Sequence, residues 1–314
     1  LFNNATIALL VALQSLELTG EVITTPFTFI ATTNAIHWNN LSPVYVDIEP
    51  RTLNIDPIKI EEAITPKTTA ILPVHCYGNA CDVDSIEAIA KSHGLKVIYD
   101  AAHAFGVRCH CGSLLNHGDL SVVSFHATKV FNTFEGGAII SHTAEMKQRI
   151  DRLKNFGFES ETRVIAPGVN GKLSEIHAAV GLAQLKYIDQ NILTRQRIDE
   201  YYRKRLSQIR GLRCIPEQGQ IRSNYSYFPL IIEDDFPLTR NQLLERLKKD
   251  NVYCRRYFYP TTPALLGETA EDPQCDPPKL REAHNAAARV LCLPIYPNLD
   301  SSQMSTICDT IESI

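Results

Sequence analysis

Lys96-Val-Ile-Tyr-Asp100 is a short apolar run that ends in a carboxylate. Its length and its β-branched residues predict a buried strand over Lys96–Asp100. Similar runs lie on both sides of it and alternate with helical patterns. We expect further strands at Val22–Thr25, Val44–Ile48, Ala70–Pro73, Leu120–Phe125 and Ala138–Ser141. This alternation predicts an α/β fold in which helices cover a mostly parallel sheet.

The sequence also predicts where several helices begin and end. Asp56-Pro57 offers a cap followed by a proline at the first helical position. Asp84 with Glu87 resembles a capping box for a helix that ends at Gly94. A long helical region, continuous or interrupted, is expected from about Ser174 to Gln208, and we expect it to bridge two domains.

The pattern changes beyond Gly211. There we expect a compact α+β domain made of strands Tyr225–Ile232 and Val252–Tyr257, helix Thr239–Lys249 with Thr239 and Gln242 as its capping box, and helices near Leu280–Ala288 and Ser302–Ile311. The sequence therefore predicts a large domain over residues 1–210, including the bridging helix, and a small C-terminal domain over 211–314.

Composition favours a small-molecule substrate. The 314 residues are 44% hydrophobic and 21% charged with a formal charge of −4, a near-neutral balance that argues against a nucleic acid or a membrane surface as the main partner. The apolar stretch Ala5–Leu13 is too short to span a bilayer. Since the chain opens at Leu1 without an initiator methionine, we expect the natural protein to begin upstream.

The nine cysteines do not form the pattern of a disulfide framework, because their number is odd and they are scattered. They predict a reducing, cytoplasmic location. Cys109-His110-Cys111 is too tightly spaced for a zinc knuckle and no second ligand pair accompanies it, so a surface loop without metal is expected.

The candidate catalytic residues follow two of the predicted strands. Asp100 ends one of them, and in open α/β sheets ligands bind at the carboxyl ends of strands. Ser124-Phe-His-Ala-Thr-Lys129 leaves another and precedes Glu135-Gly-Gly137. A lysine in that place can be partly desolvated, which lowers its pKa and lets it form a Schiff base. Taken singly, Asp100 reads as a turn cap and Lys129 as a solvated lysine. Together with Ser124 they favour a catalytic site.

Several ordered motifs resemble the DegT/DnrJ/EryC1/StrS aminotransferases, which are fold-type-I pyridoxal-phosphate enzymes. The resemblance covers nearly the whole chain, and its pieces are Asn4–Leu9, Thr25–Phe29, Pro73–Gly78, Asp100–Gly106, Ser124–Lys129 and Asn170–Ala179. It implies that pyridoxal 5'-phosphate is the cofactor, with a large domain that binds it and a small C-terminal domain.

The same resemblance implies roles for individual residues. Lys129 would hold the cofactor and move the substrate proton, and Asp100 would pair with the pyridine nitrogen. Phe29 would stack on the ring and His103 would lie near the ring hydroxyl, although a core phenylalanine and a structural histidine would look the same. The phosphate would be bound by Ala5 and Thr6 at a helix start, by Ser124, and by Asn170 from the neighbouring subunit. This implies a homodimer with composite active sites.

The implied reaction is amino transfer from L-glutamate to a nucleotide-linked sugar. Ser121–Gly137 with Asn170–Lys172 is most similar to family members that form dTDP-4-amino-4,6-dideoxyglucose, which implies dTDP-4-keto-6-deoxyglucose as acceptor and amination at C4. Amination at C3 is the alternative. Family dehydratases carry histidine at the lysine position, and a non-catalytic regulator has no need to keep Lys129, Asp100 and Ser124, so both are disfavoured.

Other features of the sequence stay open. Arg255–Pro260 matches a region where family members approach substrate, but exposed arginines on a strand explain it nearly as well. Thr261–Pro263 and Gly267–Pro278 depart from the family pattern, so no substrate contact is predicted there. The sequence does not decide whether the product enters lipopolysaccharide O-antigen or a small molecule.

Overall fold

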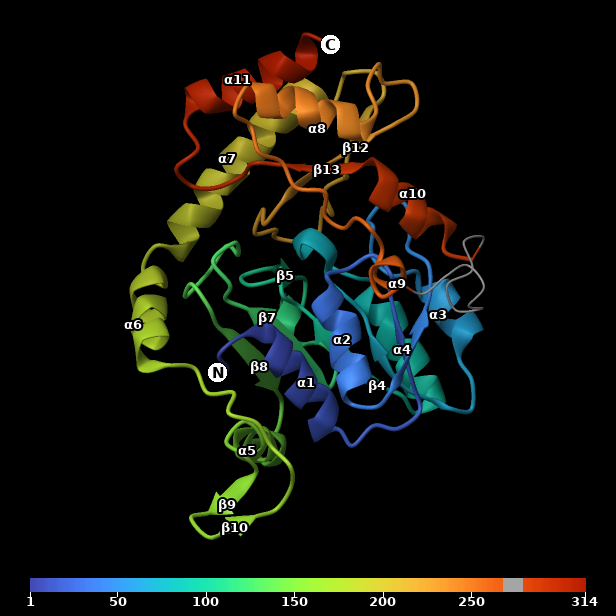
Figure 1. The fold of residues 1–314 in the computed structure, drawn as a ribbon, viewed down its shortest axis with the longest axis vertical. Coiled ribbons are helices and arrows are strands. Elements are labelled where there is room, and N and C mark those ends of the chain that lie inside the picture. The colour runs from blue at the N-terminus through green and yellow to red at the C-terminus, as the bar shows by residue number, and fades with distance from the viewer. Residues whose placement is uncertain (268–278) are drawn as a thin grey trace.

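A six-stranded sheet forms the larger part of the molecule (Figure 1). The computed structural model describes residues 1–267 and 279–314. The strand order is β2-β1-β3-β4-β7-β8, and every neighbouring pair is parallel except β7 with β8. The strands are β1 Glu21–Thr24, β2 Ser42–Tyr45, β3 Thr68–Leu72, β4 Lys96–Asp100, β7 Leu120–Ser124 and β8 Gly137–Ser141. The predicted α/β fold with a mostly parallel sheet is confirmed.

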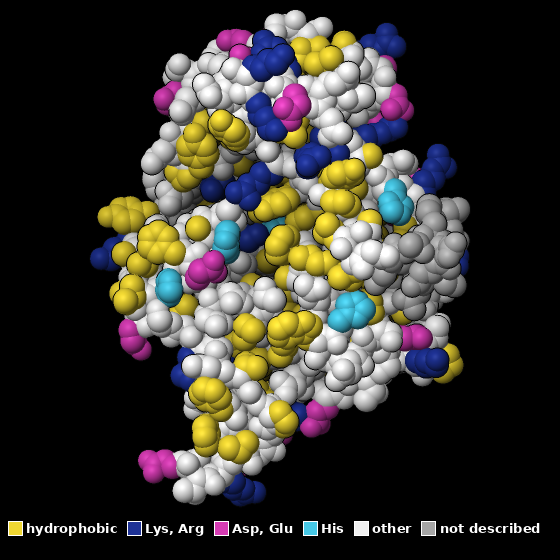
Figure 2. Space-filling view, in the orientation of Figure 1, with side chains coloured by type: hydrophobic (Ala, Val, Ile, Leu, Met, Phe, Trp, Pro, Cys, Tyr) yellow, Lys and Arg dark blue, Asp and Glu magenta, His cyan; other side chains and the backbone are white. Residues whose placement is uncertain are grey.

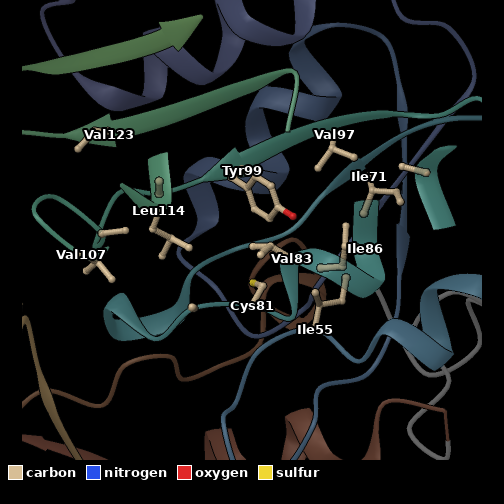
Figure 3. Packing of buried hydrophobic residues seen from close by; sticks show 14 of the residues in the cluster. Ile55, Ile71, Cys81, Val83, Ile86, Val97, Tyr99, Val107, Leu114 and Val123 are labelled. Carbon is tan, nitrogen blue, oxygen red and sulfur yellow. The ribbon is translucent and has the colours of Figure 1, made fainter. Parts of the chain in front are cut away.

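Helices cover both faces of this sheet, and strand β4 shows why. Val97 and Tyr99 point into one core, which is covered by α3 (Pro57–Ala63) and α4 (Val83–His93). Ile98, between them, points into the opposite core, which is covered by α1 (Ala5–Ser15), α2 (Ile30–Trp38) and α5 (Ala144–Leu153). A strand that is buried on both sides reads as a continuous apolar run, as the sequence predicted. Figure 3 shows Val97 and Tyr99 in the first core.

Strand β2 departs from its expected bounds. It covers Ser42–Tyr45, whereas the sequence predicted Val44–Ile48. The reason lies at Asp47, whose carboxylate accepts hydrogen bonds from the backbone N–H groups of Glu282 (2.9 Å) and Ala283 (2.8 Å). The chain therefore leaves the sheet early and caps a helix of the C-terminal part.

The helix ends follow the predicted chemistry in two of three cases. Asp56 caps α3 ahead of Pro57, and Thr239 and Gln242 form a capping box at α8 (Arg240–Lys249). At α4 the predicted cap is wrong: Asp82, not Asp84, accepts from the N–H of Ser85 at 3.1 Å. Glu87 is consequently free of a capping role and binds elsewhere. Gly94 ends α4 in the left-handed conformation, as expected.

A second, antiparallel sheet of three strands lies above the first in Figure 1. It consists of β11 (Leu212–Cys214), β12 (Phe228–Ile232) and β13 (Val290–Leu293), packed against α7 (Ile188–Leu206), α8 and α11 (Ser301–Glu312). The expected long helical region is two helices, α6 (Glu175–Gln184) and α7, separated by a break. Because α7 already packs into this second core, the domain boundary at residue 210 stays a prediction.

The predicted strand Val252–Tyr257 is wrong. Within the described residues this segment has a single β-bridge, in which Arg255 exchanges backbone hydrogen bonds with Cys292 at 3.1 and 2.8 Å. One residue alone reaches the outer edge of β13, and the chain then turns toward the large sheet. That turn brings Tyr257 and Phe258 to the cavity described below.

Smaller elements complete the described structure. They are β5 (Arg108–Cys109), β6 (Gly112–Ser113), β9 (Phe158–Ser160), β10 (Arg163–Val164), the 3-10 turns Cys76–Gly78 and Leu114–Asn116, α9 (Thr262–Leu265) and α10 (Arg281–Arg289). The hairpin β9–β10 projects away from the body of the molecule beside α5 (Figure 1). Among the described residues no helix combines the length and apolar character needed to cross a bilayer.

Candidate active site

A cavity opens where β4 and β7 end, between the large sheet and the C-terminal part. It is lined by residues of both parts: Asn4, Ala5, Thr6, Leu9, Thr28, Phe29, Ala31, Val74, Asp100, Ala102, His103, Ser124, His126, Thr128, Lys129, Glu135, Tyr257 and Phe258. Seven of the eight residues predicted from sequence are among them. Figure 2 shows this face hollowed between the two parts, with basic, histidine and hydrophobic side chains meeting there.

Lys129 lies in the loop after β7, which is folded back on itself. The backbone N–H of Phe125 donates to Gly136 O at 2.8 Å, and the N–H of Ala127 donates to Phe134 O at 2.7 Å. The Nζ of Lys129 lies 3.3 Å from the hydroxyl of Tyr227. Burial lowers the pKa of Lys129 to about 8, and the Asp100 carboxylate opposes that shift. At pH 7 roughly a tenth of this amine would therefore be neutral, and so nucleophilic, which is far more than for an ordinary lysine.

Asp100 is buried at the end of β4, and two groups donate hydrogen bonds to its carboxylate. Its carboxylate accepts from the Thr32 hydroxyl at 2.7 Å and from the backbone N–H of Ala102 at 3.1 Å. Thr28 continues this chain, with its hydroxyl 2.9 Å from that of Thr32. Burial raises the pKa of Asp100 although these hydrogen bonds and Lys129 lower it. A cation placed beside Asp100 would therefore gain a strong, desolvated partner.

His103 is buried and held in one tautomer. The backbone N–H of Tyr77 donates to its Nδ1 at 3.1 Å. Burial, with Lys129 nearby, keeps the pKa of His103 well below its usual value, so the ring is neutral. The proton of the neutral ring then sits on Nε2, which makes His103 a hydrogen-bond donor toward the cavity it lines.

The start of α1 forms one side of the cavity. Asn4 caps this helix, its side chain accepting from the N–H of Ile7 at 2.8 Å, so the Thr6 side chain is not needed as a cap. The N–H groups of Ala5 and Thr6, in the first turn, have no acceptor within the helix. The Ser124 hydroxyl accepts from His126 N–H at 3.3 Å, which leaves its own O–H to donate.

Gly137 makes this arrangement possible, and sequence reasoning did not single it out. A Cβ at Gly137 would lie 2.8 Å from the backbone nitrogen of Ala5. Only glycine lets β8 run this close to the start of α1, where Gly137 also exchanges backbone hydrogen bonds with Phe2. The signal in the sequence was the pair Gly136-Gly137 directly before a strand.

Phe29 lines the cavity from the residue before α2, and its side chain is 54% exposed, so it is not a core phenylalanine. The competing interpretation of Phe29 is therefore wrong. Tyr257 and Phe258 line the cavity as well, and Arg255 hydrogen-bonds the Tyr257 hydroxyl at 2.8 Å. The sequence motif Arg255–Pro260 was the signal for these two residues.

Four further residues were missed. The Thr32 hydroxyl donates to the Asp100 carboxylate, and the Tyr227 hydroxyl contacts the amine of Lys129. Glu135 and His126 both line the cavity, with 3.7 Å between a carboxylate oxygen and Nε2. Thr32 carried no sequence signal, since it lies inside an ordinary helix.

Asn170 is the one predicted residue outside the cavity. It is exposed, forms a β-bridge with Asn155, and its side-chain oxygen accepts from Lys172 Nζ at 2.8 Å. Of the segments that departed from the expected pattern, Thr261–Pro263 begins α9, where Thr262 donates from its backbone to Pro26 O at 2.9 Å. Residues 268–278 of the other segment lie outside the described residues.

Known proteins match this chain over nearly its whole length. A family model described as the DegT/DnrJ/EryC1/StrS aminotransferase family matches residues 1–312. The chain belongs to this family. The predicted family membership and fold are thereby confirmed.

Two known proteins are similar to it along nearly the entire chain. The dTDP-4-amino-4,6-dideoxy-D-glucose transaminase of Shigella dysenteriae is 53% identical over 314 residues, which are 100% of this chain and 85% of that protein. The Escherichia coli protein of the same name is 52% identical over 308 residues, covering 96% of this chain and 81% of that one. The crystal structure of DesI in the presence of its TDP-sugar product is 35% identical, with a TM-score of 0.91 over 99% of this chain and 79% of DesI.

Proposed function

We propose that this aminotransferase uses pyridoxal 5'-phosphate to transfer an amino group from L-glutamate to C4 of dTDP-4-keto-6-deoxyglucose. The observation that carries the proposal is the identity of 53% over the full chain with a dTDP-4-amino-4,6-dideoxy-D-glucose transaminase. The site is compatible with it, because a lysine of lowered pKa and a buried carboxylate line one cavity.

The donor set of the cavity matches the groups of the cofactor. Lys129 offers an amine to its carbonyl carbon, and Asp100 offers a desolvated carboxylate to its ring nitrogen. Neutral His103 can donate to the ring hydroxyl, and Phe29 offers an aromatic face to the ring. The start of α1 with Ser124 suits the phosphate. When bound, the cofactor supplies an electron sink for the carbanion that forms as the substrate proton leaves.

Each protein group then has a task. Asp100 would keep the cofactor's ring nitrogen protonated, since loss of that proton would leave a buried carboxylate without its partner. With the cofactor bound, Lys129 would hold its carbonyl carbon and, once released, its amine would act as the base for the proton on the donor's α-carbon. Its lowered pKa suits both the nucleophilic and the basic role near neutral pH. Thr32 holds Asp100 in place through its hydrogen bond.

The first half-reaction can be tested alone. Glutamate added to the yellow, cofactor-loaded protein should convert it to the aminated form and release one equivalent of 2-oxoglutarate per site. Protein that takes up no cofactor, or that glutamate leaves unchanged, would contradict the proposal.

We also propose a homodimer with composite sites, in a cytoplasmic setting. Asn170 is exposed and outside the chain's own cavity, as expected of a residue that serves the site of a partner. The eight cysteines among the described residues are all free thiols, which fits a reducing compartment. A destination of the product in O-antigen stays a prediction.

Subunit mixing tests the composite site. Lys129→Ala and Asn170→Ala chains should each be inactive or strongly impaired, whereas a denatured and refolded mixture should regain activity, because one site of each hybrid dimer has both native residues. Refolded wild-type protein and each variant refolded alone are the controls. A mixture no more active than its components, or a fully active wild-type monomer, would refute the shared site.

The pKa of Lys129 can be tested by the rate of cofactor uptake. Because the neutral amine reacts, and the pKa is about 8, uptake by cofactor-free protein should rise about tenfold from pH 7 to pH 9 and then level off. The amine of an N-acetyl-lysine reference should instead keep gaining rate toward its ordinary pKa, near 10.4. A protein curve parallel to the reference would show that Lys129 is not desolvated.

A further inference from the structure

A cluster of soft ligands lies outside the active site, on the hairpin β5–β6. The Sγ atoms of Cys109 and Cys111 are 2.7 Å apart, and the Nε2 of His117 lies 3.5 Å from the first and 3.1 Å from the second. Both cysteines are free thiols. Among the described residues this is the one group of three such side chains whose ligand atoms converge, all within 4.8 Å.

The local fold brings these atoms together. Val107 and Leu114, on either side of the hairpin, are fully buried in the core shown in Figure 3, and the N–H of Leu114 donates to Val107 O at 3.1 Å. The hairpin between them turns at Gly112, whose φ of +120° is reserved in practice for glycine. Both thiols therefore face the loop that enters β7, which carries His117.

His117 is oriented from behind by α4. Its Nδ1 lies 2.9 Å from Glu87 Oε1, and the same oxygen accepts from the N–H of Gly118 at 3.2 Å. With Nδ1 donating to the carboxylate, the lone pair of Nε2 points to the two sulfurs. A metal-bound histidine usually donates its other ring N–H to a carboxylate or a backbone oxygen, which fixes the orientation of the ring. Glu87 does not cap α4, and its carboxylate instead contacts His117.

We propose that Cys109, Cys111 and His117 bind one Zn²⁺, with a fourth position open to solvent on this exposed face. Two thiolates and an imidazole are the ligand set that zinc prefers, and each thiol gives up its proton on binding. Bond lengths of about 2.3 Å to sulfur and about 2.0 Å to nitrogen place tetrahedral ligands roughly 3.8 Å apart for S–S and roughly 3.5 Å for S–N.

The cluster is close to that geometry. The sulfur–nitrogen distances, 3.5 and 3.1 Å, need little change. The two sulfurs must separate by about 1 Å, which the exposed side chain of Cys111 permits by rotation. From the sequence, Cys109-His110-Cys111 was too tightly spaced for a zinc knuckle and lacked a second ligand pair, but in the structure a single histidine, six residues after Cys111, lies beside both sulfurs.

The place of the site gives it a structural consequence. Arg108, next to Cys109, exchanges backbone hydrogen bonds of 3.1 and 2.8 Å with Arg222 of the C-terminal part. Two residues further, the Asn224 amide donates to the backbone oxygens of His103 (2.7 Å) and Phe105 (2.9 Å). Zinc at the hairpin would therefore stabilise the position of Arg108 against Arg222. The segment that contains Arg222 and Asn224 contacts the backbone of His103, which lines the active-site cavity.

Metal content and stability test the proposal. The wild-type protein, reduced, loaded with Zn²⁺ and desalted, should retain about one zinc per chain by plasma mass spectrometry, and Co²⁺ should give the visible absorption of a tetrahedral thiolate site. Cys111→Ser and His117→Gln should lose both signals. Cys214→Ser, which removes a free thiol elsewhere, is the matched control and should retain them. Glu87→Gln should weaken zinc binding by about 10- to 100-fold.

Unfolding by circular dichroism supplies a second readout. Zn²⁺ should raise the melting temperature of the wild type and of Cys214→Ser but not of Cys111→Ser. A cofactor absorbance like that of the wild type shows that each variant is folded, so loss of zinc cannot be confused with loss of structure. A reduced wild-type protein that retains no zinc, or equal zinc in Cys111→Ser and the wild type, would overturn the assignment.

Discussion

Replacing Lys129 by alanine should abolish turnover. The substitution removes the amine that would hold the cofactor and also the base that would move the substrate proton. Loss of the base alone costs about 10²- to 10⁴-fold in rate, and loss of the covalent attachment adds to it. We expect cofactor to bind still, through the groups around its ring and phosphate, but without the absorbance that borohydride removes from the wild type.

Lys96→Ala is the matched control for this variant. Lys96 begins β4, at the opposite end of the strand from Asp100, and its Nζ pairs with Asp119 at 2.8 Å on a half-exposed surface. Its loss should leave turnover unchanged. A Lys129→Ala protein with near-normal transaminase rate would remove Lys129 from the mechanism, whatever the control does.

Replacing Asp100 by asparagine should lower kcat at least about 10²-fold while the cofactor remains bound. The amide fills the same space and can still accept from Thr32 or Ala102, so the fold should survive. It cannot keep the ring nitrogen protonated, and the electron sink is weakened. Burial already raises the pKa of Asp100, so a neutral side chain is tolerated there.

Two companion variants separate charge from structure. Asp119→Asn, at the other end of the neighbouring strand, should keep full activity because, among the described residues, the Asp119 carboxylate accepts from the backbone of Val97 and the amine of Lys96 at the far edge of the sheet. Thr32→Val removes one hydrogen bond to Asp100 but leaves its charge, so it should cost far less than Asp100→Asn. Equal kcat in Asp100→Asn and the wild type would exclude the proposed role of this carboxylate.

The sequence predicted the chemical centre better than its surroundings. Asp100 and Lys129 follow buried strands, and strand ends in a parallel sheet meet at one edge, so their convergence could be expected. Phe29, His103 and Ser124 entered through their motifs and line the same cavity. The roles of these three residues were expected from the family resemblance that their motifs carry.

Residues placed by long-range packing escaped prediction. Tyr227 reaches Lys129 from a segment 98 residues later, and its sequence surroundings read only as the start of a strand. The prediction of a strand at Val252–Tyr257 was wrong, because only Arg255 of the described segment pairs with β13. The apolar pattern of a segment does not show whether a neighbouring strand is available to pair with it. His117, the third ligand of the proposed zinc site, carried no sequence signal either, since Glu87, which orients it, lies on a separate helix.

The carbon that receives the amino group tests the central proposal most directly. Cofactor-loaded protein, aminated with glutamate and freed of excess donor, should return to its yellow form when dTDP-4-keto-6-deoxyglucose is added. NMR of the product should show nitrogen on C4, as in dTDP-4-amino-4,6-dideoxyglucose. Amination at C3 of a 3-keto sugar nucleotide with no reaction of the 4-keto sugar would contradict the account.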